Sequence, residues 1–301
     1  MFIGRTALRL TSVPRFRRTM PLLCATATLI AASNCFAASL FSVTPGNRMI
    51  NELNPNTGEL LNSFPTPINV PSDGFGLAFT GTELFVSQFG HPNIWRLDAK
   101  TGAVVSSFVA PSASSPRAGS GIDALAYGQT SFGPTLFALE YAARRMHLWN
   151  PTSGVAFLSY PLPMVNQSPG GFRPGGGLDF NSVDGTLVLS YFSQNISLLR
   201  KIDPSTGQLL STLSPPPVFG RYVFGIGLVA GRLFTGGDSD LIEEHDPVTG
   251  SVIRSFASPG GRVGALAGGP VPEPVTERLA LVAASLLFIH SARYCRGSAH
   301  S

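Results

Sequence analysis

The sequence predicts an all-β fold, a five-bladed β-propeller, from three observations. A turn of the form Asp/Asn-x-x-Thr/Ser-Gly occurs five times, and its glycines are spaced 44, 52, 53 and 43 residues apart. Short apolar runs flank every copy, as strands do. One further short run follows the last copy and has no turn of its own. Four-stranded units that repeat every roughly 40 to 50 residues are typical of propeller blades.

The five turns share one physical logic. Asp or Asn at the first position accepts hydrogen bonds from the backbone that follows it, and Gly at the last position adopts the positive φ that ends the turn. We therefore expect hairpin turns at five segments: Asn54 to Gly58, Asp98 to Gly102, Asn150 to Gly154, Asp203 to Gly207 and Asp246 to Gly250.

Each turn is expected to join the third and fourth strands of a blade. In four copies apolar residues stand four and one before the turn's first residue, as Ile94 and Leu97 do before Asp98, and the fifth copy has Ile242 and His245 there. This spacing is not strict alternation, so the second of these residues is expected to belong to the turn or to a bulge. The predicted second strands are Leu40 to Thr44, Leu84 to Ser87, Leu136 to Leu139, Leu187 to Ser190 and Leu233 to Thr235. The predicted fourth strands are Leu60 to Phe64, Val104 to Phe108, Val155 to Ser159, Leu209 to Leu213 and Val252 to Phe256.

Innermost strands are predicted where small residues flank one leucine, because the centre of a propeller is crowded. They are Gly76 to Phe79, Ala124 to Tyr127, Gly177 to Phe180 and Gly227 to Ala230. The first blade lacks such a strand, and the segment from Gly264 to Ala267 belongs to none of the five repeats. We therefore expect this segment to form the innermost strand of the first blade and so close the ring. The phrase from Gly177 to Ser190 resembles blade entries of the NHL and YVTN type. A β-sandwich with similar turns is the alternative.

The chain is divided into a predicted signal peptide at 1–37, a propeller at 38–270 and a tail at 271–301. The first segment carries five arginines and no acid, then an apolar run, then Cys35-Phe36-Ala37. This order is typical of a secretory signal peptide. A twin-arginine signal at Arg17-Arg18 and a lipoprotein signal at Cys35 fit these residues less well.

The tail begins with four residues, Val271, Pro272, Glu273 and Pro274. A run of 11 apolar residues follows, from Leu279 to Ile289, and then Arg293 and Arg296. A short hydrophobic helix is expected here, although about 20 residues are needed to cross a bilayer. This order resembles the PEP-CTERM sorting signal. The resemblance implies that an exosortase in the inner membrane of a bacterium removes the tail and that the protein reaches the cell surface or extracellular matrix. A retained single-pass helix is the alternative.

Charge and cysteine content exclude several function classes. Residues 38 to 273 hold 13 basic and 16 acidic residues, so the high isoelectric point belongs to the two ends and nucleic-acid binding is not expected. The same stretch contains no cysteine, which excludes a disulfide, a zinc-thiolate site and a cysteine nucleophile there. No phosphate-binding glycine motif is present, and no cofactor is expected.

In a propeller the five turns lie on one face, here called the turn face. The loops that enter the inner strands lie on the opposite face, here called the loop face, and we expect the ligand there. The predicted ligand-binding residues are Gln88, His91, Asn93, Arg144, Arg145, Tyr191 and Asn195. No polar residue type recurs at one blade position, so no metal site is expected, and Asp238-Ser239-Asp240 is interpreted as solvated acids rather than a calcium site.

Three functions remain open. A non-catalytic binding module for exopolysaccharide or a surface protein is favoured, because no catalytic constellation emerges. The second is a glycosidase- or lactonase-like enzyme that uses Asp73, Asp123 and Glu140, provided that they lie within about 10 Å of one another. The third is a structural matrix protein. Tyr141, Trp95 and Trp149 are interpreted either as sugar-stacking residues or as core residues.

Overall fold

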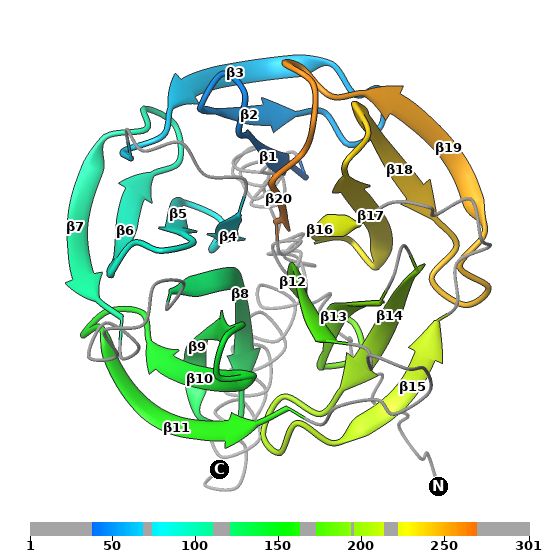
Figure 1. Ribbon diagram of the computed structural model, residues 1–301. Helices are drawn as coiled ribbons and strands as arrows, with labels where there is room; N and C mark the ends of the chain where they lie inside the picture. Colours follow the sequence, from blue (N-terminus) through cyan, green and yellow to red (C-terminus); the bar gives the residue numbers. More distant parts are fainter. Residues whose placement is uncertain are drawn as a thin grey trace, which may run out of the picture. The chain divides into compact units, whose positions relative to one another are not determined.

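The computed structural model describes residues 38–68, 74–110, 121–162, 173–193, 196–213 and 222–269. The described residues form five antiparallel four-stranded sheets arranged in a ring (Figure 1), which confirms the predicted five-bladed propeller. The predicted signal peptide, 1–37, and the predicted tail, 271–301, lie outside the described residues. In the part of the chain that the structure describes, no helix has the length and apolar character needed to cross a bilayer.

Each blade runs from an inner to an outer strand. From centre to rim, the first two blades are β20 (Ala265–Gly268), β1 (Leu40–Thr44), β2 (Met49–Leu53) and β3 (Leu60–Pro65), then β4 (Phe75–Phe79), β5 (Glu83–Gln88), β6 (Asn93–Asp98) and β7 (Val104–Val109). The third is β8 (Ile122–Thr130), β9 (Gly133–Glu140), β10 (Arg145–Asn150) and β11 (Val155–Pro161). The last two are β12 (Arg173–Asn181), β13 (Thr186–Ser193), β14 (Ile196–Ile202) and β15 (Leu209–Leu213), then β16 (Val223–Val229), β17 (Arg232–Gly237), β18 (Leu241–His245) and β19 (Val252–Ala257).

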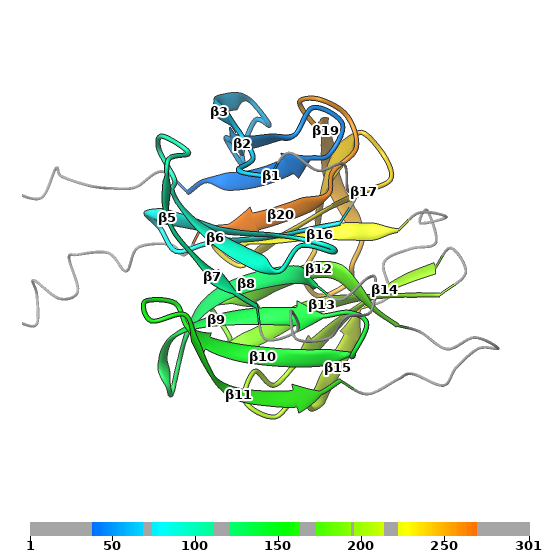
Figure 2. The ribbon, with the colours of Figure 1, turned by 60° about the vertical axis from the view of Figure 1, so that its left-hand side comes forward.

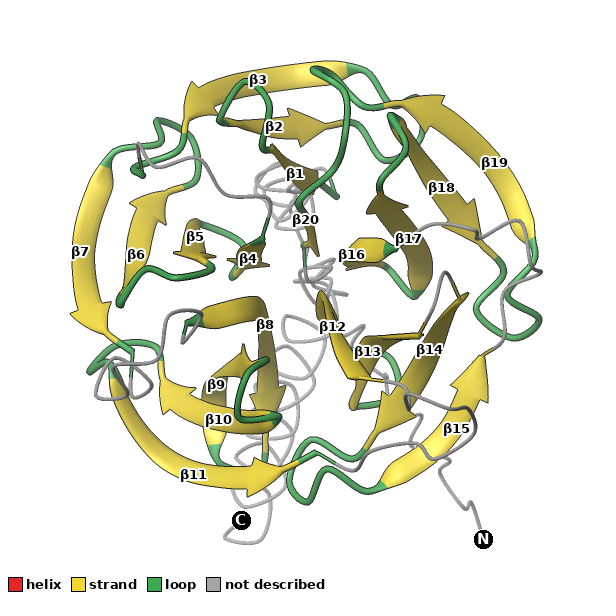
Figure 3. Ribbon diagram, viewed as in Figure 1, coloured by secondary structure: helices red, strands yellow, loops and turns green. Residues whose placement is uncertain are grey.

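The inner strands β20, β4, β8, β12 and β16 surround the centre, and each contacts the next around the ring. Figure 3 shows strands in every blade and no helix among the described residues. In Figure 2 the strands β8 to β11 lie one beside another from centre to rim. Buried apolar side chains fill the spaces between neighbouring blades, so the core is divided among the blade interfaces.

The last strand closes the ring on the first. β20 pairs antiparallel with β1, with Ala265 opposite Val43 and Gly268 opposite Leu40. Beyond the strand, the Gly269 N–H donates to the Ser39 carbonyl at 3.1 Å. The prediction that the orphan run completes the first blade is confirmed, and both ends of the described chain therefore lie side by side at the turn face.

One inner strand differs from its prediction by two residues. In the fifth blade Leu228, not Ala230, pairs with Leu233, as Phe79 pairs with Leu84 in the second blade. The structural equivalent of Gly76 is therefore Gly225. Glycine occurs at both position 225 and position 227 of this strand, and the prediction began the strand at Gly227 instead of Gly225.

The five turns form as predicted. In each, the terminal glycine N–H donates to the carbonyl of the turn's first residue at 2.8 to 2.9 Å, and all five glycines have positive φ. The first residue's side-chain oxygen accepts from the N–H groups that follow at 2.7 to 3.0 Å. Of the two alternatives for the residue before the turn, the structure shows the bulge, and it is present in all five blades.

Turn glycines also join neighbouring blades. The Gly102 backbone lies against the ring of Phe64 from the preceding blade, and a Cβ at Gly102 would come within 2.4 Å of that ring. The same contact joins Gly154 to Phe108 and Gly207 to Tyr160. Glycine is therefore required here both for its positive φ and for the approach of the aromatic ring.

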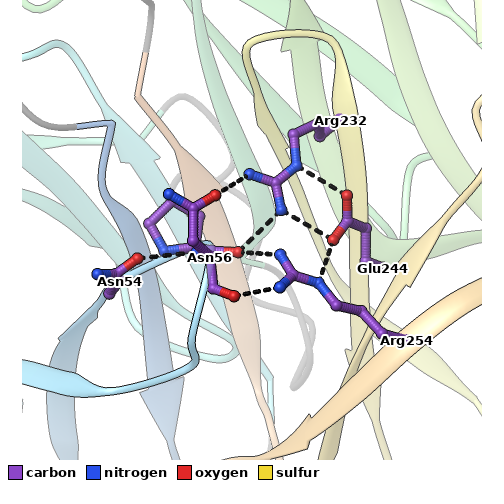
Figure 4. A network of polar contacts seen from close by, with 6 residues as sticks. Asn54, Asn56, Arg232, Glu244 and Arg254 are labelled. Atoms are coloured by element: carbon purple, nitrogen blue, oxygen red, sulfur yellow. Dashed lines mark hydrogen bonds and ion pairs between the residues drawn. The ribbon is translucent and has the colours of Figure 1, made fainter.

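A polar network reinforces the seam between the last and first blades (Figure 4). Glu244 on β18 accepts from Arg232 at 2.7 and 2.8 Å and from Arg254 at 2.5 Å. Both arginines also donate to the Pro55 carbonyl in the first blade's turn, at 3.0 and 2.6 Å. Hydrogen bonds from Arg232 hold the pKa of Glu244 below its ordinary value. One carboxylate thus orients two cations that clamp a backbone segment about 190 residues earlier in the chain.

Asp179 holds three backbone segments together near the centre. Its Oδ2 accepts from the Leu228 N–H on β16 at 2.6 Å and from the Gly268 N–H on β20 at 3.0 Å, while Oδ1 accepts from Phe180. Burial raises the pKa of Asp179 to about 7, although these three hydrogen bonds favour the carboxylate. Its side chain joins three of the five inner strands.

Candidate functional site

A pocket of about 260 Å³ lies where the inner strands begin, at the loop face. Five equivalent residues, one from each blade, line it, and each precedes the small residue of its inner strand. They are Phe75, Asp123, Gly176, Phe224 and Gly264. The remaining lining residues are Gly74, Phe89, Tyr141 and Phe192. The described part of the propeller therefore converges on one central cavity.

Irregular strand pairing places two of these side chains. Asp123 is an extra residue in β8, between the pairs Ile122 with Glu140 and Ala124 with Leu139. Phe224 is an extra residue in β16 in the same way. The pairing of β12 is also interrupted between Pro174 and Leu178. A bulge redirects a side chain without breaking the sheet, and bulges are common beside active sites.

Aromatic side chains form a continuous wall. Phe89, Tyr141 and Phe192 occupy the same position in three consecutive blades, directly after or at the end of the second strand. The rings of Tyr141 and Phe192 are stacked, with centroids 6.0 Å apart and an interplanar angle of 12°. Tyr222 continues the wall, with centroids 5.1 Å from Phe192 and 5.8 Å from Phe224.

Asp123 supplies the carboxyl group of the pocket. Its Oδ2 accepts the Tyr141 backbone N–H at 2.8 Å. Burial, with a smaller contribution from the negative charge of Glu140, raises the pKa of Asp123 to about 7. The group therefore changes its charge near neutral pH.

Glu140 faces away from the pocket lining. Its Oε2 lies 3.1 Å from Nε2 of His147 on β10, and both side chains are buried. Burial lowers the pKa of His147, which favours the neutral imidazole. The structure thus brings Asp123 and Glu140 to neighbouring strands but gives them different surroundings.

The structure places the other predicted site residues around the pocket rather than in it. Gln88 and Tyr191 are buried, and each directly precedes an aromatic residue of the pocket in the sequence. The guanidinium carbon of Arg200 lies 4.8 Å from the centroid of the Tyr191 ring. The ring of His91 packs on Trp95, and its Nδ1 accepts the Asn93 N–H at 3.3 Å.

Two predicted arginines lie in the hairpin between β9 and β10. Arg144 is exposed with a φ of +51°, and Arg145 donates to the Ser159 hydroxyl at 3.0 Å. Neither lines the pocket. Asp73, Asn195 and the predicted sorting motif lie outside the described residues.

The pocket lining includes Asp123 and Tyr141, which the sequence analysis named, and Phe89, Phe192 and Phe224, which it did not name. A signal was available in the sequence. In three blades an aromatic residue stands two positions after the end of the repeated Leu-x-x-Ser or Leu-x-x-Leu run, as in Ser190-Tyr191-Phe192. Because side chains alternate across a strand, choosing Gln88, Glu140 and Tyr191 selected the opposite face. Trp149 is a core residue.

A smaller cavity, of about 220 Å³, lies at the turn-face end of the centre. Tyr127, Gln129, Phe180 and Ser182 are among its lining residues. No group of three His, Cys, Asp or Glu side chains suited to a metal ion occurs among the described residues. Asp238 pairs with Arg262 at 2.9 Å.

Comparison with known proteins identifies the fold. No protein-family profile and no curated protein sequence matches this chain. A chain of the nidogen/laminin complex matches over 78% of this chain and 100% of its own length, with 13% identity and a TM-score of 0.53. Glutaminyl cyclase of Myxococcus xanthus matches over 62% of this chain and 71% of its own, with 19% identity and a TM-score of 0.47. At 13% identity the likeness to the nidogen/laminin chain shows the fold alone.

Proposed function

We propose that this chain is an exported, non-catalytic binding module that takes its ligand into the aromatic pocket on the loop face. The observation that carries the proposal is the convergence of five aromatic residues and Asp123 on one central cavity. Apolar pockets with a few polar groups are the usual form of a ligand site. The ligand is carried by an exopolysaccharide or a surface protein.

The predicted tail supports delivery to a surface, because Val271-Pro272-Glu273-Pro274 and the apolar run that follows resemble the PEP-CTERM sorting signal. Mass spectrometry of the native protein should find no peptide beyond Pro272 to Pro274 if the tail is removed. Recovery of peptides from residues 279–301 would contradict the exosortase proposal.

An enzyme acting on sugars or lactones is the second candidate, and one observation favours it. A carboxyl group with a pKa of about 7, as Asp123 has, suits a general acid. Hydrolysis of a glycoside needs a second carboxylate at the reacting centre. Glu140 does not line the pocket and contacts His147 instead. The arrangement therefore favours binding over catalysis.

Binding to an array of glycans and surface-protein extracts tests the proposal. We expect a ligand whose signal falls by up to about tenfold in Phe192→Leu, because stacking on an aromatic ring contributes about 0.5 to 1.5 kcal/mol. Phe157→Leu is the matched control, since Phe157 is exposed on β11, away from the pocket. Equal loss in both variants, or none in either, would contradict the pocket's role. Turnover of glycoside or lactone substrates that disappears in Asp123→Asn would establish the enzyme instead.

A further inference from the structure

The composition of the pocket selects a class of ligand. Of the nine described residues that line it, five are aromatic, three are glycine and one is Asp123. Saccharides present many hydroxyl groups, each of which loses hydrogen bonds to water when it is buried. Among the described lining residues, only Asp123 and Tyr141 carry side-chain groups that could replace those bonds. The pocket wall is thus poorly matched to a sugar ring buried on all sides.

Aromatic walls with a carboxylate suit organic cations. The face of an aromatic ring carries a partial negative charge. Rings that surround a methylated ammonium group therefore attract it, and no hydrogen bonds are required. The wall already holds one cation at its edge, because the guanidinium carbon of Arg262 lies 4.9 Å from the centroid of Phe224. Asp238 pairs with that arginine at 2.9 Å. Among the residues that the structure describes, neither lysine nor arginine lines the pocket itself.

We propose that the loop-face pocket binds a quaternary ammonium group, with the aromatic rings against its methyl groups and the Asp123 carboxylate as its countercharge. This inference rests on the proposed function, because it names the ligand group of the same pocket. The volume of about 260 Å³ lies below the roughly 300 to 1,000 Å³ of sites for drug-sized molecules, which fits a head group rather than a chain of sugars.

The surroundings of Asp123 are consistent with this assignment. The neighbouring charge that acts on it is that of Glu140, which is also negative, and His147 beyond Glu140 favours its neutral form. A cation in the pocket would offset the burial of the carboxylate. Binding should therefore release a proton when it begins below pH 7, and affinity should rise between pH 6 and pH 8.

Calorimetric titration of the purified protein with two probes of nearly the same shape tests the inference. Choline carries a trimethylammonium group, and 3,3-dimethyl-1-butanol replaces its charged nitrogen by carbon. We expect choline to bind at least about tenfold more tightly at pH 8, because only the cation is attracted to the faces of the aromatic rings and to the Asp123 carboxylate. Asp123→Asn should reduce choline affinity about tenfold and leave the affinity for the alcohol unchanged. Phe192→Leu should weaken both, and Phe157→Leu should weaken neither.

The outcomes separate this inference from the proposed function. Equal affinity for the two probes would overturn the cation assignment and leave the pocket as a binding site. If neither probe binds but the array ligand is lost in Phe192→Leu, the cation assignment again fails alone. If neither probe binds and Phe192→Leu has no effect, both fail. Once choline binding is established, competition by a phosphocholine-bearing glycan and by a trimethyl-lysine peptide distinguishes the source of the ammonium group.

Discussion

The two faces of the propeller are built from the same repeat but differ in how strictly they follow it. On the turn face, all five blades end their third strand in a bulge and the same glycine-ended turn. On the loop face, one equivalent position holds Phe75, Asp123, Gly176, Phe224 and Gly264. The turn face thus has the same turn structure in every blade, whereas the equivalent position of the loop face holds phenylalanine in two blades, glycine in two and aspartate in one.

The difference has a physical origin. Four of the five turn glycines, Gly58, Gly102, Gly154 and Gly207, lie against an aromatic ring from a neighbouring blade, so packing leaves no room for a side chain there. The inner-strand entry positions line the central cavity, and their side chains differ from blade to blade. Residues that line a cavity on a rigid scaffold are where binding usually resides. Substitutions on the turn face should therefore change stability, and those in the pocket should change binding.

Deleting residues 262–270 should have the largest effect. The deletion removes β20, exposes the edge of β1 and leaves Asp179 without its Gly268 partner. We expect the free energy of unfolding to fall by about 5 kcal/mol or more, a large share of a typical domain's stability. Urea unfolding followed by fluorescence measures it. Unchanged unfolding would contradict closure by β20.

Asp179→Ala should cost about 3 kcal/mol, because it leaves the Leu228 and Gly268 N–H groups buried without their acceptor. Asp179→Asn keeps one acceptor oxygen and is the matched control.

The pH dependence of Asp179 has a definite sign. Its folded-state pKa of about 7 is above the ordinary value of 3.8, so the folded protein retains the proton longer than the unfolded chain. The contribution of Asp179 to the free energy of unfolding is therefore fully present below about pH 4 and is lost as the pH rises through about 7. Asp179→Asn should remove that decline, as urea unfolding at pH 5 and pH 8 would reveal. An identical difference between the two pH values in both proteins would contradict a raised pKa.

Gly102→Ala should cost about 2 kcal/mol, from the positive φ of +69° and the clash with the Phe64 ring. Gly133→Ala is the control, because Gly133 also has positive φ, of +89°, but has no atom within 4 Å of the added Cβ. Thermal unfolding should place the Gly102 variant below the control. Equal melting temperatures would show that the aromatic contact does not constrain the turn.

Glu244→Gln should cost about 1 kcal/mol, because both arginines of the seam network are partly exposed and solvent screens them. Since the pKa of Glu244 is lowered, its contribution is present above the ordinary value of 4.5 and is lost as pH falls below it. Glu83→Gln is the control, since Glu83 pairs with Arg96 inside one blade. A larger loss in Glu83→Gln, measured by chemical unfolding, would contradict the importance of the seam.

Local chemistry made the fold predictable from the sequence. The turns depend on contacts within five residues, and the spacing of Ile94 and Leu97 before Asp98 predicted an irregularity there, either part of the turn or a bulge; the structure shows a bulge. Closure by β20 followed from counting strands. The fifth inner strand was misplaced by two residues because glycine occurs at both Gly225 and Gly227.

The site was less predictable, because it depends on register and on contacts between blades. Asp123 is the extra residue of a bulge in β8, and this bulge determines where its side chain points. The sequence Gly121-Ile122-Asp123 contains no local signal that predicts the bulge. The stacking of Tyr141 on Phe192 joins residues 51 positions apart in two blades. Glu140 was assigned to the same site as Asp123, but its contact with His147 became visible only in the folded sheet.

The separation of stability from binding is tested most directly by measuring both quantities in two matched variants. Phe108→Leu changes the ring that packs on Gly154 at the turn face, and Phe192→Leu changes a ring of the pocket wall. We expect Phe108→Leu to lower the melting temperature by about 3 °C and leave choline affinity unchanged. Phe192→Leu should lower choline affinity about tenfold and leave melting within about 1 °C. The reverse pattern would contradict the separation of stability from binding. An equal loss of stability in both variants with unchanged choline affinity would contradict it as well.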